Sequence, residues 1–261
     1  MRLGNSVAAC PHSDNIYQER TLGLAFCVNQ PMQDCMTDAS DTGNTTDTGK
    51  VSRRTRILNA AEKLFSQKGY DAVSLREIAR EADVDLALPN YYFGRKPKVF
   101  EAAFLRRAQL LNEWRLDALD KAIAASAPNP PSVHAIMDAY LRPILTGRHI
   151  KDSGWKHYYA LVAYVNNSTE WGGKLMSEFF DPMVERFLSA LRTSMPNASD
   201  KDIFWSYQCL SGSLTLAFAQ TGRLDRLSHG KLRSTDLESG CDTMIDFCTA
   251  GFLAACEKAD T

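Results

Sequence analysis

The chain carries at residues 74–96 the stretch SLREIAREADVDLALPNYYFGRK, which decides its fold. Ser74 and Glu77 stand three residues apart at the front of an apolar-periodic run, the spacing of a capping box. In that arrangement each side chain bonds the free backbone N–H of the other residue, so a helix is predicted to begin at Ser74. Val73 and Ile78 flank the cap at the positions of a hydrophobic staple, which fixes how the chain enters the helix.

A second short helix is predicted directly after the first. Ala82-Asp83-Val84 interrupts the helical period, and Asp85 offers another N-cap oxygen. The run from Leu86 to Tyr92 has helical character and is ended by Gly94. Two short helices across a three-residue turn form a helix-turn-helix.

The charge of the chain is distributed unevenly, although the formal net charge is only -1. Residues 50–98, which contain the helix-turn-helix, hold 11 Lys and Arg against 6 Asp and Glu, whereas the segments before and after are both net acidic. Binding to phosphates requires a basic surface of this kind, so the segment favours double-stranded DNA as a partner. The alternative is an ordinary solvated helical surface that is rich in Lys.

Several classes of site have no signature in the sequence. The 7 cysteines form neither a CxxC pair nor a zinc-binding spacing with histidine, which argues against a disulfide scaffold and a metal site. No HExxH motif, serine elbow, P-loop or Rossmann fingerprint occurs, so we expect no enzymatic activity, no catalytic residue and no cofactor. No apolar run approaches the roughly 18 residues that a membrane span needs, so we expect a cytoplasmic protein without a membrane partner.

Residues 1–50 show no hydrophobic periodicity. The part from Thr37 to Lys50 consists almost entirely of Thr, Asp, Gly, Ser and Asn, which cannot bury enough apolar surface to offset the entropy of ordering. We therefore predict that residues 1–50 are disordered. Met36 lies just before this tract and is an alternative translation start, which would place residues 1–35 outside the native protein.

From Ser52 onward the periodic segments are helical, and no β-alternation is visible. Besides the two short helices, helices are predicted at residues 52–68, 99–125, 132–146, 155–165, 167–195, 200–221 and 235–256. The fold class is therefore all-α. A three-helix domain at 51–98 is followed at 99–261 by about six helices that share one core.

Three features modify the helices of the larger domain. Asn167 and Glu170 repeat the capping-box spacing ahead of the segment that runs to about residue 195. Pro143 is expected to kink its helix, and Asp181-Pro182 is expected to bend or divide the helix that contains it, because proline removes a backbone hydrogen bond.

The basic segment resembles the N-terminal signature of the TetR family of bacterial transcriptional regulators. The residues that carry the resemblance are Arg53, Thr55 to Leu58, Ala60-Ala61, Leu64-Phe65, Gly69-Tyr70, Ser74 to Ala79, Ala82-Asp83-Val84 and Tyr91 to Lys96. The ending Asn90-Tyr91-Tyr92-Phe93-Gly94 is similar to the NYHFGSK variant of that signature. The resemblance implies a ligand-released repressor that acts as a homodimer on a palindromic operator.

Three residues depart from the family pattern. Asp83 stands where Gly is usual in the turn, and Asp tolerates left-handed backbone better than most residues. Pro89 falls about four residues into the second short helix, where it is predicted to remove one of the first intrahelical bonds and to tilt the helix. Arg95 replaces a capping Ser, and Pro97 in the first turn of the next helix supplies rigidity.

The family layout places the second short helix in the major groove, with its first residues at base edges. Base contacts are predicted for Asp85 and Asn90 by hydrogen bonding, and for Leu86, Ala87 and Leu88 through thymine methyl groups. Phosphate contacts are predicted for Thr55, Ser74, Arg76, Tyr91, Tyr92 and Lys96, while Arg53 and Arg54 form an arm that reaches a minor groove. Phe93 is expected to be packing, and for Tyr91 packing and phosphate contact both stay open.

Aromatic residues are concentrated in the middle of the larger domain. The predicted effector pocket consists of Trp155, Tyr158, Tyr159, Trp171 and Phe179. His157, Asn166 and Asn167 lie beside them, which fits a small-molecule site that is mostly apolar with few polar anchors. The effector is therefore expected to be apolar or aromatic, and the resemblance implies that it shifts the two DNA-binding heads of a dimer. The alternative is that these side chains are ordinary core.

The last two long helices are the predicted homodimer interface, because they carry more apolar side chains than one chain needs for its own core. The predicted interface residues are Phe204, Tyr207, Leu214, Phe218, Met244, Phe247, Cys248 and Phe252. The small residues from Ser211 to Ser213 would allow close approach, so pairing across a two-fold axis gives a four-helix bundle. The alternative is that both helices are internal.

These features predict a sequence-specific DNA-binding transcriptional regulator. One alternative is an all-α enzyme or small-molecule carrier with an incidental helix-turn-helix, which the coincidence of motif and basic charge argues against. Another is a nucleoid-type protein that binds DNA without sequence preference, which competition by unrelated DNA distinguishes.

Overall fold

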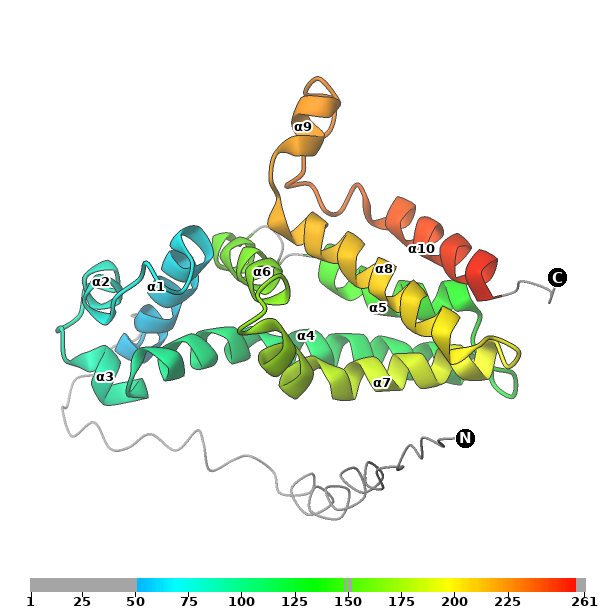
Figure 1. Cartoon of the computed structure of the whole chain (residues 1–261), viewed down its shortest axis with the longest axis horizontal. Coiled ribbons are helices and arrows are strands. Elements are labelled where there is room, and N and C mark those ends of the chain that lie inside the picture. The colour runs from blue at the N-terminus through cyan, green and yellow to red at the C-terminus, as the bar shows by residue number, and fades with distance from the viewer. Residues whose placement is uncertain (1–50, 148, 150–151, 257–261) are drawn as a thin grey trace, which may run out of the picture. The chain divides into compact units, whose positions relative to one another are not determined.

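The computed structural model describes residues 51–147, 149 and 152–256, and these residues contain helices and no strand (Figure 1). The all-α prediction is confirmed. The predicted disorder of residues 1–50 and the alternative start at Met36 lie outside the described residues. None of the described helices is long and apolar enough to cross a membrane.

The helix α1 (Arg53–Lys68) ends where it was predicted to end and begins one residue later, after its N-cap Ser52. The side chain of Ser52 accepts a hydrogen bond from the first turn, and Gly69 ends the helix with a φ of 77°, a left-handed value that glycine adopts without strain. One face of α1 is buried, so this helix forms one wall of the core.

The helix α2 (Leu75–Glu81) begins with the complete capping box. Ser74 Oγ accepts from the backbone N–H of Glu77 at 3.2 Å, and Glu77 Oε2 accepts from the backbone N–H of Ser74 at 2.9 Å. The turn that follows has its left-handed residue at Asp83, with a φ of 51°, and the Asp83 carboxylate pairs with Arg56 of α1 at 3.3 Å. The predicted cap and turn are both confirmed.

The helix α3 (Leu88–Phe93) begins two residues later than predicted. Asp85 does not cap it: its carboxylate accepts from the backbone N–H of Ala87 at 2.8 Å and thereby holds a turn before the helix. Pro89 consequently lies in the first turn of α3, where its missing N–H would have no helical partner in any case. The prediction that Pro89 removes an intrahelical bond was wrong.

The long helix α4 (Lys96–Ser126) begins three residues earlier than predicted, after Arg95. It packs against α1 and α3 near its start and against helices of the larger domain along the rest of its length (Figure 1). Buried side chains from Val99 to Leu119 follow one stripe of α4. The same helix therefore belongs to the N-terminal head, which we define as residues 51–98, and to the larger domain.

The remaining helices follow α4 along the chain. They are α5 (Val133–Leu145), α6 (Ser153–Asn166), the π-helix η2 (Gly172–Met176), α7 (Ser177–Ser194), α8 (Asp200–Ala219), α9 (Arg223–Leu227) and α10 (Cys241–Cys256). Of these, α5, α6 and α7 pack directly against α4. Helix α6 packs against α1 of the head and against α8, while α5 and α10 pack on each other. One continuous hydrophobic core joins head and larger domain.

The segment between α6 and α7 differs from the prediction. Asn167 caps the C-terminus of α6, because its Nδ2 donates to the carbonyl of Ala163 at 2.8 Å, and it does not start a new helix. The chain re-enters helix through η2, and α7 continues through Pro182. The lost hydrogen bond at Pro182 is tolerated because buried side chains on both sides of it, Phe180 and Met183, hold α7 on the core.

The helix α10 begins six residues later than Thr235, where it was predicted to begin, and the short helix α9 was not predicted. Side-chain bonds to the backbone hold the connection instead: Asp225 accepts from the N–H of Ser234 at 2.8 Å, and Asp236 accepts from the N–H of Ser239 at 3.2 Å. Such local bonds compete with helix formation.

A buried carboxylate ties three helices together. Glu62 of α1 is only 1% exposed and accepts from Arg106 Nε at 3.0 Å and from Arg107 Nε at 3.1 Å, both on α4. The guanidinium of Arg107 also lies 4.7 Å from the ring centroid of Trp155 on α6. A Cβ on Gly154 would come within 2.5 Å of Arg107 Nη2, so the start of α6 packs tightly against the same cation.

Replacing Glu62 by Gln tests this junction. Glu62→Gln leaves two partly buried arginines without their counter-charge, and we expect it to lower the free energy of unfolding by about 3 kcal/mol. The matched control is Asp117→Asn, which breaks the exposed pair with Lys121 and should cost less than about 0.5 kcal/mol. Chemical denaturation measures both values, and equal losses would contradict the assignment.

The two glycines of η2 provide a second test. A Cβ at Gly172 would lie 2.9 Å from the carbonyl oxygen of Val165, whereas a Cβ at Gly173 would meet nothing within 4 Å. We expect Gly172→Ala to destabilise the protein by about 1–3 kcal/mol through overpacking against backbone. Gly173→Ala should be neutral or slightly stabilising. Thermal unfolding of the pair checks the prediction, which fails if Gly172→Ala melts like the wild type.

Candidate DNA-binding surface and effector pocket

Most of the predicted DNA contacts are exposed side chains of the head. Eleven of the 13 are exposed, namely Arg53, Arg54, Thr55, Ser74, Arg76, Asp85, Leu86, Ala87, Asn90, Tyr91 and Tyr92; Leu88 and Lys96 are partly buried. They come from the starts of α1 and α2, from the turn before α3, from α3 itself and from the first residue of α4. A base-reading or phosphate-binding role for these residues is compatible with this exposure.

The aromatic residues of α3 divide between surface and core. Tyr91 is 76% exposed, and its ring meets that of Tyr92 edge to face, with centroids 5.4 Å apart. Phe93 is partly buried against the core, with the Arg54 guanidinium 5.2 Å above its ring. Arg53 and Arg54 lie in the first turn of α1, so the prediction that they form an arm was wrong. Arg54 instead joins α1 to Phe93 of α3, while Tyr91 projects outward.

Lys96 is held against the head rather than extended into solvent. Its Nζ donates to the carbonyl of Asp71 at 3.2 Å and lies 4.3 Å from the ring centroid of Tyr70. Tyr70 in turn packs on Phe100 and Trp171. A phosphate contact by Lys96 would therefore be made from a side chain that is already positioned.

The carboxyl group of Glu77, in the first turn of α2, has a lowered pKa. The backbone N–H of Ser74 and then Lys68 lower the pKa of Glu77 to about 2, so the carboxylate stays charged at neutral pH. Because this pKa is depressed by folding, the stabilisation is present above the ordinary pKa of Glu and is lost as the pH falls toward 2. The N–H groups of Ser74 and Glu77 are both used internally, which leaves Leu75 and Arg76 to offer N–H groups to a phosphate.

The five residues of the predicted effector pocket lie in packed core. Trp155, Tyr158 and Tyr159 are buried, and Trp171 and Phe179 are partly buried. The Tyr159 ring stacks on Phe218 with centroids 4.3 Å apart, and Trp171 packs on Tyr70 at 4.7 Å. None of the five lines either cavity described below, because their rings fill the space between helices.

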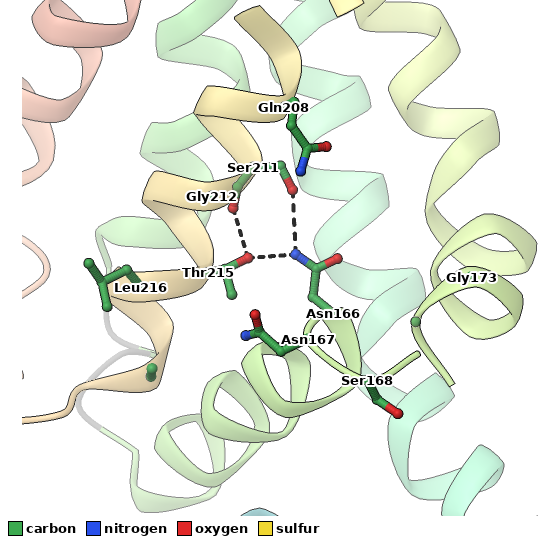
Figure 2. Close-up of a pocket in the computed structure, with 11 residues that line it drawn as sticks. Asn166, Asn167, Ser168, Gly173, Gln208, Ser211, Gly212, Thr215 and Leu216 are labelled. Carbon is green, nitrogen blue, oxygen red and sulfur yellow. Dashed lines mark hydrogen bonds between the residues drawn. The ribbon is translucent and has the colours of Figure 1, made fainter. Parts of the chain in front are cut away.

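An open cavity, which we call the outer pocket, has a volume of about 480 Å³ and lies between the end of α6, η2 and α8 (Figure 2). Its wall is rich in polar side chains: Asn166, Asn167, Ser168, Gln208, Ser211 and Thr215. A smaller space of about 30 Å³, the inner cavity, is lined by Arg115 of α4, by Tyr140 and Tyr207, and otherwise mainly by apolar side chains. Both spaces lie between helices of the larger domain.

Three residues border both the outer pocket and the inner cavity: Asn166, Ser211 and Thr215. Asn166 Nδ2 donates to Thr215 Oγ1 at 2.6 Å and to Ser211 Oγ at 3.5 Å, as Figure 2 shows. Asn166 was predicted to lie beside the effector pocket, but the small residues near Ser211 were assigned to the dimer interface, so the contribution of Ser211 and Thr215 to this partition was missed. The available signal was the pair of hydroxyls at residues 211 and 215, one helical turn apart.

The predicted dimer residues fall into two groups. Leu214, Phe218, Cys248 and Phe252 are buried in the chain's own core, so they are internal rather than available to a partner. Phe204 and Phe247 are exposed, while Tyr207 and Met244 are partly buried. The outward face also contains Trp205, which is 65% exposed, and Leu216, neither of which was predicted.

Sequence comparisons identify both parts of the chain. Residues 57–103 match the family described as "Bacterial regulatory proteins, tetR family", and residues 138–251 match "Tetracyclin repressor-like, C-terminal domain". A 52-residue segment is 46% identical to the "Probable HTH-type transcriptional regulator YttP" of Bacillus subtilis, covering 20% of this chain and 25% of the relative. An 84-residue segment is 33% identical to the "HTH-type transcriptional regulator HbdR" of Aromatoleum, covering 32% and 35%.

The matched segments thus span about a quarter to a third of the length of these curated relatives. Solved structures match over more of the chain. A tetR family regulator from Shewanella has a TM-score of 0.55 at 17% identity, covering 79% of this chain and 98% of that one. The fatty acid degradation regulator FadR from Bacillus halodurans has a TM-score of 0.56 at 14% identity, covering 78% and 98%. At such identities the likeness concerns the fold, and together with the two matched family profiles it shows that the chain belongs to the TetR family of transcriptional regulators.

Proposed function

We propose that the protein is a sequence-specific DNA-binding transcriptional regulator, a repressor that a small molecule releases from its operator. The observation that carries this proposal is the basic head, which presents the turn before α3 and α3 itself to solvent with Leu86 55% and Tyr91 76% exposed. An exposed leucine and tyrosine beside Arg53, Arg54 and Arg76 suit a surface that meets DNA. A DNA partner implies a location in the cytoplasm.

In the proposed complex α3 enters the major groove. Asn90 offers an amide that can pair with adenine, and the exposed Leu86 and Ala87 meet thymine methyl groups. Because Asp85 is occupied by the Ala87 N–H, Asn90 is the stronger hydrogen-bonding candidate. Few polar base readers remain, so specificity rests on methyl contacts, on Arg53 and Arg54 at the start of α1 and on DNA shape.

The proposed homodimer joins the outward faces of α8 and α10. Phe204, Trp205 and Phe247 are exposed there, and a Cβ at Gly212 or Gly251 would meet nothing within 4 Å, so a second copy has room to approach closely. Exposed aromatic side chains are enriched at the cores of protein interfaces. Two heads related by this axis would read a palindromic operator.

The direct test of the proposed function is a footprint on the DNA upstream of the protein's own coding sequence. A protected palindromic segment that resists competition by unrelated DNA supports sequence-specific binding. Equal competition by unrelated DNA would point to the nucleoid-type alternative. The absence of any complex at low salt would refute a DNA-binding function.

A substitution of Lys96 tests the predicted phosphate contacts. We expect Lys96→Ala to weaken binding to operator and unrelated DNA alike, and to reduce the slope of log affinity against log salt by about one, because one phosphate contact is lost. The matched control is Lys121→Ala, at the opposite end of α4, which should leave the slope unchanged. Thermal unfolding records any effect of losing the Asp71 bond. An unchanged slope in Lys96→Ala removes the residue from the interface.

Trp205 tests the homodimer. We expect Trp205→Glu to weaken self-association at least tenfold, since truncating a central interface tryptophan typically costs about 2 kcal/mol or more. The control Leu227→Glu alters a leucine of α9 that is equally exposed, at 66% against 65%, and lies outside the proposed face. Sedimentation velocity at micromolar concentration measures both. A monomeric wild type, or two variants that dimerise equally well, would overturn the proposed interface.

A further inference from the structure

Arg115 carries a buried charge that forms no ion pair within the described part of the chain. Among the described residues, Glu62 and Arg115 are the two charged side chains in the buried class, at 1% and 3% exposure. Glu62 has two arginines around it. Within residues 51–147, 149 and 152–256, Arg115 has no carboxylate at ion-pair distance. A buried charge without a counter-ion is costly, so its presence calls for a partner.

The groups around Arg115 do not replace that partner. Its Nε donates to the backbone carbonyl of Tyr140 at 3.1 Å, and its guanidinium carbon lies 4.3 Å from the centroid of the Tyr140 ring. These contacts orient the guanidinium but leave it with its full charge. Arginine offers five N–H donors in a planar fork that suits an oxyanion, and Arg115 lines the inner cavity.

We propose that the effector of this regulator carries an oxyanion, a carboxylate or a singly attached phosphate or sulfonate, that binds Arg115 in the inner cavity. This proposal rests on the proposed regulator function and specifies the chemical class of the effector. The inner cavity, at about 30 Å³, admits only a small group such as a carboxylate. Tyr207 lines it too, and burial followed by Tyr140 raises the pKa of that phenol, so Tyr207 stays neutral beside an anion.

The remainder of the ligand has its space next to this cavity. The outer pocket, at about 480 Å³, has the size of a small-molecule site and is separated from the inner cavity by Asn166, Ser211 and Thr215. Turning the Asn166 amide away from Thr215 would break the 2.6 Å bond and connect the two spaces. The effector is thus a small organic oxyanion whose body lies against the largely polar wall of the outer pocket. A neutral or cationic molecule of the same shape would leave Arg115 unpaired.

The test uses two fluorescent probes that differ only by the anionic group, anilinonaphthalene sulfonate and N-phenylnaphthylamine. We expect the full-length wild type to bind the sulfonate at least tenfold more tightly than the neutral amine, since a buried charge-assisted bond is lost without it. Arg115→Met should abolish that preference while leaving the affinity for the amine unchanged. Arg115→Lys should retain it in part, and the control Arg186→Met, at an exposed ion pair of α7, should retain it in full.

Displacement of the bound sulfonate by decanoate, decyl phosphate and decanol then distinguishes the oxyanions. Either acid displacing the probe ahead of the alcohol supports the proposal, and the better acid identifies the head group. Equal displacement by all three, no saturable binding of either probe to the wild type, or an unchanged preference in Arg115→Met would overturn it.

The outcome is separable from that of the proposed function. A footprint that persists in wild type and in Arg115→Met, combined with no preference for the sulfonate, refutes the oxyanion while leaving the regulator intact. A preference for the sulfonate without any DNA complex refutes the regulator instead. If Arg115→Met does not melt cooperatively, the wild-type preference and the Arg115→Lys affinity decide the question.

Discussion

The arrangement of the helices depends on the neutralisation of one buried carboxylate. Glu62 lies on the buried face of α1, and its charge is compensated by Arg106 and Arg107 of α4. Separating these helices would leave charges buried without partners, at a cost of several kcal/mol. Arg107 also stacks on Trp155 of α6, so the same cation fixes the start of α6. The orientation of the N-terminal head relative to α4 and α6 is therefore specified by charge as well as by apolar packing.

Helix α6 connects this junction to the cavities. Along its length it touches the head, where the hydroxyl of Tyr164 accepts from the backbone N–H of Tyr70 at 3.2 Å, and it ends at Asn166, between the outer pocket and the inner cavity. Trp171, just before η2, packs on the Tyr70 ring, and the ammonium of Lys96 lies against the same ring. A ligand that displaces α6 or η2 would therefore move the Tyr70 ring, and Tyr70 contacts Lys96, a proposed phosphate-binding residue. This chain of contacts is a physical route for the proposed release from DNA.

Local chemistry could be predicted from the sequence, and contacts between distant helices could not. The capping box of Ser74 and the left-handed turn at Asp83 depend on neighbouring residues, so spacing alone identified them. The start of α3 and the role of Asn167 were mistaken because a polar side chain can bond the backbone on either side of it. Aromatic residues near Trp155 looked like a pocket because composition does not say whether rings fill a space or line it. Arg115, one turn from the buried Leu111 and Leu119, interrupts an apolar stripe and was the available signal for the inner cavity.

The proposed pocket and the proposed dimer share one helix. Gln208, Gly212 and Leu216 are exposed on α8 and also line the outer pocket, so the surface offered to a second copy includes the rim of that pocket. A ligand in the pocket and a partner on α8 would therefore act on the same side chains. Since coupling between binding sites is reciprocal, any ligand that lowers the affinity of the dimer for DNA must itself bind more weakly to the DNA-bound dimer by the same factor. We expect the packing of α8 against the second copy to determine how large this reduction in affinity is.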